Sequence, residues 1–218
     1  MYRYLFFDLD GTLTDSKEGI IRCARYAIDK MDTPQPDEAT LLKFIGPPLQ
    51  DSFMTHCGYT RAQAAQALAI YRQRYVPVGQ YENRPGPGLV EMCRRLREKG
   101  YVLALASSKP EELCVSICDR FGFAPYLSAT TGSPPDGDWE KADVIREAMR
   151  RLGLTETDKP AILMVGDRKF DVLGAKECGI DCAGVEFFGY AAPGELRDHG
   201  AVTVARTAEE LEQFILTH

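Results

Sequence analysis

Two aspartates, Asp8 and Asp10, stand two residues apart directly after a short apolar run, 4–7, near the start of the chain. The run has the length and composition of a buried strand. Residues two apart in a strand point to the same face, so both carboxylates are expected to project together while Leu9 turns to the other side. Their repulsion would be relieved by a divalent cation, a shared proton or both, and such oxygen ligands suit Mg²⁺. The structural alternative is a solvent-exposed turn in which Asp10 or Thr12 caps a helix.

A second predicted strand, AILMVG at 161–166, also ends in acidic residues. Asp167 follows it directly, and Asp171 comes four residues later, one turn into the next predicted helix. If this strand lies parallel to and beside the first, Asp167 lies close to Asp8 and Asp10. An acidic cluster of that kind requires a cation.

A third strand end carries groups that could bind a phosphate. YVLALA at 101–106 is followed by Ser107, Ser108 and Lys109, which supply hydroxyl donors and a positive charge. Lys141, in the segment DGDWEKADVI, is a further candidate cation. Its alternative interpretation is a solvated lysine in the first turn of a helix.

The elements that must position these residues follow an alternating pattern. Helical spacing of apolar residues separates the short apolar runs, and each helical segment ends on Gly, the favoured residue just past a helix end. Alternation of strand and helix is typical of a parallel sheet covered on both faces, so we predict a doubly wound, Rossmann-like α/β core. The predicted strands span 4–7, 101–106, 161–166, 181–185 and 201–205, and the helices 88–100, 111–122, 139–153 and 169–179.

One region breaks this alternation. Residues 15–84 carry only helical patterns, and the chain returns to the α/β pattern through the Pro/Gly-rich stretch NRPGPG at 83–88. We therefore predict an α/β catalytic core formed by 1–14 and 85–218, with an inserted all-helical domain at 15–84. An insertion at the carboxyl end of a strand lies where open α/β sheets bind ligands. The helical segments are 18–31, 37–46, 49–58 and 61–76.

Composition excludes several classes of protein. The chain has 218 residues, 44% of them hydrophobic, which is enough to bury a sizeable core. It has no apolar stretch of the roughly 20 residues that span a bilayer and no signal-peptide pattern, so we expect a cytoplasmic protein without a membrane partner. The net charge of -6 and dispersed basic residues disfavour nucleic acid. Seven cysteines without a CxxC pair favour reduced thiols, and nothing in the sequence indicates an oligomeric state.

Four stretches resemble, in order, the four motifs of the haloacid dehalogenase superfamily, and the resemblance covers essentially the whole chain. They are FDLDGTLTDS, LASSKP, Lys141 and MVGDRKFD. The DxDGT form is similar to the phosphatase branch, and the helical insertion after the first motif resembles the small cap of its phosphoglycolate phosphatase and β-phosphoglucomutase group. FIGPPLQDSF, SSKP, GSPPDG and VGDRKFDVLGAK resemble proteins described as phosphoglycolate phosphatase-like or 5'-nucleotidase-like.

The resemblance implies a role for each matching residue. Asp8 would be the nucleophile that forms an aspartyl-phosphate, and Asp10 would be the acid/base. Ser107 and Lys141 would bind the transferring phosphoryl group. The implied Mg²⁺ ligands are Asp8, Asp10 through its backbone carbonyl, Asp167 and, in support, Asp171, and the implied substrate-binding residues of the core are Gly11, Thr12, Ser108 and Lys109.

By the same analogy the helical insertion selects the substrate. Gly46, Pro47 and Pro48 would form a rigid turn facing the active site, with Gln50 as the nearest polar group. The alternative is that this turn only separates two helices. Closure of the cap would use hinges near Asp15 and Asn83.

These observations predict a Mg²⁺-dependent phosphomonoester hydrolase that acts on a small phosphorylated metabolite, phosphoglycolate phosphatase-like in its substrate. One alternative is a 5'-nucleotidase acting on nucleoside monophosphates. Another is a phosphotransferase like β-phosphoglucomutase, which shares every core residue named above. A non-catalytic, receiver-like phosphate-binding module is a remote alternative, because receivers have about half this length and need no second aspartate.

Overall fold

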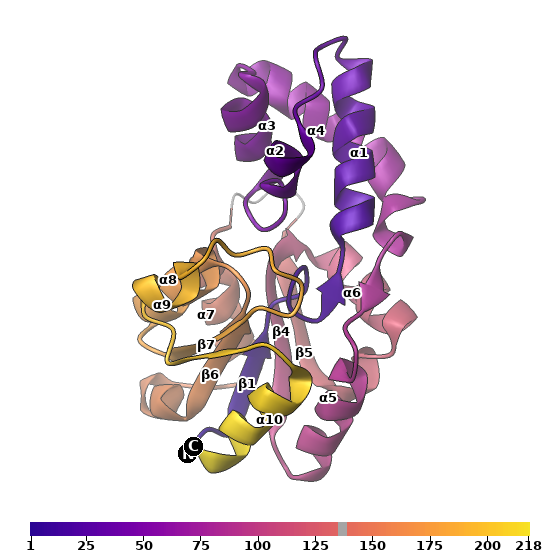
Figure 1. Cartoon of the computed structure of the whole chain (residues 1–218). Helices are drawn as coiled ribbons and strands as arrows, with labels where there is room; N and C mark the ends of the chain where they lie inside the picture. The colour runs from indigo at the N-terminus through magenta and orange to yellow at the C-terminus, as the bar shows by residue number, and fades with distance from the viewer. Residues whose placement is uncertain (135–138) are drawn as a thin grey trace. The chain divides into compact units, whose positions relative to one another are not determined.

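Six strands form one parallel sheet in the first of two units into which the described residues divide (Figure 1). The structure is a computed structural model that describes residues 1–134 and 139–218. This unit consists of residues 1–14 and 85–218, and the strand order is β5-β4-β1-β6-β7-β8. The strands are β1 (Tyr4–Phe7), β4 (Val102–Pro110), β5 (Leu127–Ser133), β6 (Ile162–Gly166), β7 (Asp181–Val185) and β8 (Thr203–Ala205).

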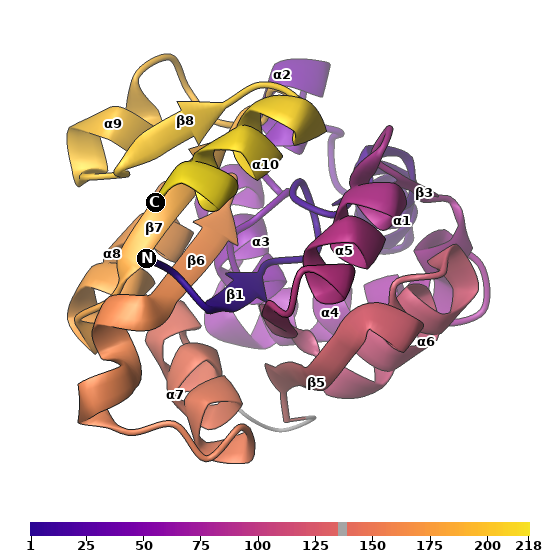
Figure 2. The ribbon, with the colours of Figure 1, turned by 90° about the horizontal axis from the view of Figure 1, so that it is seen from below.

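Helices cover both faces of this sheet, as Figure 2 shows from below. One face packs against α5 (Leu89–Glu98), α6 (Glu111–Phe121) and α10 (Ala208–Thr217). The other packs against α7 (Lys141–Arg151), α8 (Lys169–Cys178) and α9 (Glu195–His199). Short 3₁₀ helices span Ala124–Tyr126 and Glu156–Ala161. The predicted doubly wound α/β fold is confirmed.

The side chains of β1 alternate between the two apolar layers. Leu5 and Phe7 join the layer of α5, α6 and α10, and Phe6 joins that of α7 and α8. Leu9, beyond the strand end, returns to the first layer. The same alternation directs Asp8 toward the side of α7 and α8.

The sheet contains one strand that the sequence did not predict. β5 has the sequence LSATTGS, with small polar side chains in place of an apolar run, and it lies at an edge of the sheet. An edge strand is buried less completely than a central one, so the apolar signal that marked the other strands is weak here. The helices α9 and α10 were not predicted either.

The strands of the second unit, residues 15–84, are limited to Asp15, the last residue of a two-residue strand, and Arg84, the first residue of another; its regular structure is otherwise helical. Its helices are α1 (Lys17–Lys30), α2 (Glu38–Leu42), α3 (Leu49–Cys57) and α4 (Arg61–Tyr75), followed by a 3₁₀ turn at Gly79–Tyr81. Thr60 and Gln63 form a capping box at the start of α4. The helix predicted over 37–46 is shorter than expected, because α2 ends at Leu42.

The chain passes between the two units through a two-stranded sheet. Its strands are β2 (Thr14–Asp15) and β3 (Arg84–Pro85), which pair with each other. The Arg84 guanidinium reinforces this pairing through an ion pair with Asp15 at 2.6 Å. Among the described residues no helix combines the length and apolar character needed to cross a membrane.

Candidate active site

Asp8 is the first residue after β1 and is buried, with 8% of its surface exposed. The register of β1 with β6 places Phe7 beside Val165, and the Asp8 amide donates to the Val165 carbonyl at 2.9 Å. β4 lies on the other side of β1. Asp8 therefore stands at the carboxyl edge of the sheet, between the ends of two neighbouring strands.

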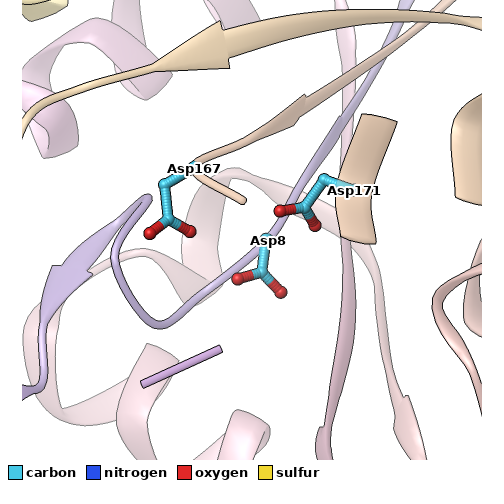
Figure 3. A group of neighbouring side chains, drawn as sticks. All are labelled: Asp8, Asp167 and Asp171. Atoms are coloured by element: carbon cyan, nitrogen blue, oxygen red, sulfur yellow. The ribbon is translucent and has the colours of Figure 1, made fainter. Parts of the chain in front are cut away.

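Three buried carboxylates converge at this edge (Figure 3). Asp8 comes from the end of β1, Asp167 from the residue after β6, and Asp171 from the first turn of α8. One carboxylate oxygen from each residue lies within 4.8 Å of those of the other two. The expected proximity of Asp167 to Asp8 is therefore present, and the third carboxylate of the cluster is that of Asp171.

Lys141, the first residue of α7, supplies a positive charge to this cluster. Its Nζ lies 2.6 Å from Asp8 Oδ1 and 2.8 Å from Asp171 Oδ1, and it also donates to the Ala106 carbonyl of β4 at 3.1 Å. The side chain is 8% exposed, so the alternative of a solvated surface lysine is wrong. Burial acts against its charge, but the two carboxylates outweigh burial and raise the pKa of Lys141 above its usual value.

The carboxylates remain crowded despite this cation. Burial is the largest cause that raises the pKa of Asp8 to about 6; Lys141 lowers this pKa, and Asp171 raises it again. Burial, followed by Asp171 and Asp8, raises the pKa of Asp167 well above its usual value. In the absence of a second cation the cluster therefore tends to hold protons at pH values where isolated carboxylates are ionised.

The cluster fits a hard divalent cation. Asp167 Oδ2 is buried and has no hydrogen-bond partner among the described residues, which is the state of an oxygen available to a metal. Three carboxylates facing one lysine leave an excess of negative charge, and oxygen ligands are those that Mg²⁺ takes. The carboxylate of Asp10 is not part of the cluster. The group of Asp10 that we predict to bind the metal is its backbone carbonyl.

Asp10 has a partner that sequence reasoning did not identify. Lys109 Nζ lies 2.6 Å from Asp10 Oδ2, and the side chains are 8% and 14% exposed. The two residues are 99 positions apart, and no local pattern indicates the pairing. β4 continues past the predicted strand end at residue 106, so Ser107 and Ser108 lie within it. Ser107 is buried, and its Oγ accepts from the Lys109 amide at 3.4 Å.

Gly11 and Thr12 contact the acidic cluster from the turn after Asp10. Gly11 has a φ of 84°, in the left-handed region, and a Cβ at this position would collide with the Asp167 carboxylate. Thr12 Oγ1 donates to Asp167 Oδ1 at 3.4 Å. Both residues therefore help to place Asp167, and their contact with a substrate stays a prediction.

The remaining predicted substrate-binding residues lie in the second unit. Gly46 and Pro47 precede α3, and Gln50 is the second residue of that helix. Their role in substrate binding stays a prediction. Residues 135–137 of the GSPPDG stretch lie outside the described residues.

A further acidic residue that no motif indicated, Glu195 at the start of α9, contacts the loop between Asp167 and Asp171. Its Oε1 accepts from the Lys169 amide at 2.9 Å and from Arg168 Nε at 3.0 Å. Its immediate sequence, PGEL, gives no signal of this contact.

The fold and this site define a family, and comparison with known proteins gives the same family. A family model described as haloacid dehalogenase-like hydrolase matches residues 5–185. The chain belongs to this family, and it is a phosphatase.

Individual relatives carry several names. A 5'-nucleotidase from Pseudomonas aeruginosa is 38% identical, covering 100% of this chain and 97% of that protein. The tyrosine-protein kinase PtkA of Mycobacterium tuberculosis is 34% identical over 97% of this chain and 72% of its own length. A phosphoglycolate phosphatase from Mesorhizobium japonicum is 28% identical over 84% and 82%. The crystal structure of a predicted phosphatase from Clostridium acetobutylicum is 37% identical and superposes with a TM-score of 0.93 over 100% of both chains.

Proposed function

We propose that this phosphatase hydrolyses phosphomonoesters of small metabolites through an aspartyl-phosphate on Asp8, with Mg²⁺ as its cofactor. The observation that carries the proposal is the buried Asp8 carboxylate, held by Lys141 at 2.6 Å beside two further carboxylates at the sheet edge. The Asp8 carboxylate can act as a nucleophile. The charged groups around it suit phosphoryl transfer, which depends mainly on positioning and charge neutralisation. Asp8, Asp167 and the Asp10 carbonyl, with Asp171 in support, would hold the cation, which would supply charge neutralisation for the phosphoryl oxygens.

The protein's own groups divide the work in this proposal. Asp8 attacks phosphorus, and the bond to the leaving oxygen breaks as Asp10 donates a proton to it. Asp10 then takes a proton from the water that releases phosphate from Asp8. Lys141 and Ser107 stabilise the oxygens of the phosphoryl group in transfer. Lys109, which forms an ion pair with Asp10 in the structure, binds either Asp10 or the substrate phosphate.

Nucleoside 5'-monophosphates are the substrate class that we place first. The support is the 5'-nucleotidase that is 38% identical over the full length of this chain, whereas the relative named phosphoglycolate phosphatase is 28% identical. This order reverses the one drawn from the motifs alone. Phosphoglycolate stays the second candidate, because the core motifs are shared by both activities.

A phosphate-release panel tests the proposal. It contains nucleoside 5'-monophosphates, phosphoglycolate, hexose phosphates and pyrophosphate, each with Mg²⁺ and with a chelator, and it compares the native protein with Asp8→Asn. We expect Mg²⁺-dependent release that is lost in Asp8→Asn, whose fold is checked by circular dichroism. Retained Mg²⁺-dependent release in that variant would refute the assigned nucleophile. Isomerised sugar phosphate without free phosphate would favour the phosphotransferase alternative.

The role of Asp10 has a separate test. An alkoxide leaving group needs a proton, whereas p-nitrophenolate leaves readily without one. Asp10→Asn is therefore expected to slow hydrolysis of alkyl phosphates far more than cleavage of p-nitrophenyl phosphate in the first step. Rapid-quench measurement of the phosphorylated protein isolates that step. Equal slowing for both substrates would contradict the role of Asp10 as the acid.

A further inference from the structure

The loop that carries two of the three clustered carboxylates is held from outside the cluster. This metal loop, residues 166–171, runs from the end of β6 into the first turn of α8. Its own contacts orient Asp171, whose Oδ2 accepts from the Arg168 amide at 3.0 Å. The position of the Arg168 backbone therefore determines where the Asp171 carboxylate points.

Glu195 fixes the two residues of the metal loop that lie just beyond Asp167. Its Oε1 accepts both from the Lys169 amide at 2.9 Å and from Arg168 Nε at 3.0 Å. The Arg168 and Glu195 side chains are 13% and 10% exposed, so this ion pair is shielded from solvent far more than the surface pairs of the chain.

Glu195 is itself fixed to the sheet. Its Oε2 accepts from the Ala192 amide at 3.2 Å, which restrains the carboxylate from a second direction. The next residue, Leu196, is 1% exposed and lies so close to Gly184 of β7 that a Cβ at that glycine would reach within 2.9 Å of it. Gly184 pairs with Gly166, where the metal loop begins. The residue next to Glu195 therefore packs on β7, and the metal loop begins at the end of the neighbouring strand, β6.

We propose that Glu195 is a positioning residue of the metal site: by holding Arg168 and Lys169 it keeps Asp167 and Asp171 aimed at the cation. The inference rests on the proposed Mg²⁺ function of the cluster. Groups that orient metal ligands affect metal affinity by about 10–100-fold when they are removed. A residue that only ties α9 to α8 would change stability without this effect.

Glu212 offers a matched control within the same unit. It accepts three hydrogen bonds from Arg95, and the two side chains are 12% and 37% exposed, but the pair links α10 to α5 on the other face of the sheet. Glu212→Ala therefore removes a comparable carboxylate–arginine pair away from the metal loop.

The experiment measures the Mg²⁺ dissociation constant of the whole protein by isothermal titration calorimetry. We expect Glu195→Ala to raise it by about 10–100-fold, and Glu195→Gln, which keeps an acceptor oxygen for Lys169, to restore most of the affinity. Glu212→Ala is expected to keep the native affinity while lowering the melting temperature. Native affinity in Glu195→Ala, or an equal loss in Glu212→Ala, would overturn the inference.

Two further outcomes are distinguishable. If Glu195→Ala does not fold, Glu195→Asp decides the matter, because it retains the charge but withdraws the oxygens by about one carbon–carbon bond, about 1.5 Å. At least about a tenfold weaker Mg²⁺ affinity is expected for it, and native affinity would overturn the inference. If the native protein itself binds no Mg²⁺, the proposed function fails, and the role of Glu195 fails with it.

Discussion

Replacement of Asp8 by asparagine is expected to make the metal-free protein more stable. Burial raises the pKa of Asp8 from its ordinary value near 3.8 to about 6 in the folded protein. Between these two values the folded protein keeps a proton that the unfolded chain has released, so stability falls as pH rises through this window. One pKa unit corresponds to about 1.4 kcal/mol, and the ionised Asp8 therefore costs the fold about 3 kcal/mol above this range.

Asparagine removes this cost because it resembles the neutral carboxyl group in shape and cannot ionise. Lys141 keeps its ion pair with Asp171 at 2.8 Å, so the buried ammonium is not left alone. We expect Asp8→Asn to exceed the native protein in free energy of unfolding by about 3 kcal/mol at about pH 8. At about pH 4, where the folded native protein holds Asp8 neutral, the difference falls below about 1 kcal/mol.

Urea denaturation in the presence of a chelator, at both pH values, provides the assay. Asp119→Asn, on the exposed side of α6, removes the same charge without burial and should lie within about 0.5 kcal/mol of the native protein. The reasoning would be refuted if Asp8→Asn were no more stable than the native protein at about pH 8, or if its advantage were the same at both pH values. If the cluster binds Mg²⁺ as proposed, added Mg²⁺ should narrow the gap, because the cation would stabilise the ionised carboxylates of the native protein.

Three further predictions concern the same cluster. Lys141→Met removes the buried cation, so the free energy of unfolding in chelator should fall by about 3–5 kcal/mol and recover in part with Mg²⁺. Urea titrations with and without the metal measure this change, and an unchanged unfolding midpoint would contradict the prediction. Mg²⁺ must displace protons from Asp8 and Asp167, so the affinity for Mg²⁺, measured by calorimetry, should weaken as pH falls below about 6. An affinity that does not depend on pH would contradict the assignment of the cluster as the metal site. Gly11→Ala should lower the free energy of unfolding by about 1–2 kcal/mol and also weaken Mg²⁺ binding, because the new Cβ meets Asp167. Gly100→Ala, at a φ of 91° with open space around it, should lower the free energy of unfolding without changing Mg²⁺ binding.

The acidic cluster was predictable because its signals are local. The apolar runs that end at Asp8 and Asp167 indicate strands, and the rule that parallel strands align their carboxyl ends brings the two residues together. Asp171 follows from its distance of one helical turn. None of these steps needs knowledge of a side-chain rotamer.

The contacts that support the cluster were not predictable in the same way. The pair of Lys109 with Asp10 joins residues 99 positions apart, and Glu195 reaches Lys169 across 26 positions. Such contacts depend on the directions of individual side chains after the strands are assembled, and a single sequence carries no periodic signal for them. β5 was missed for another reason, since its small polar residues lack the apolar run of the central strands.

The paired strands β2 and β3 make the helical unit exchangeable in principle. The chain leaves the α/β unit at Thr14 and returns at Pro85, and the Gly86 amide bonds to the Leu13 carbonyl at 3.0 Å, so the two ends of the core segments are already adjacent. A short turn between them would close the α/β unit without moving β1 or β4. An insertion attached at one such point can be lengthened, shortened or replaced during evolution while the strands that carry the acidic cluster stay the same.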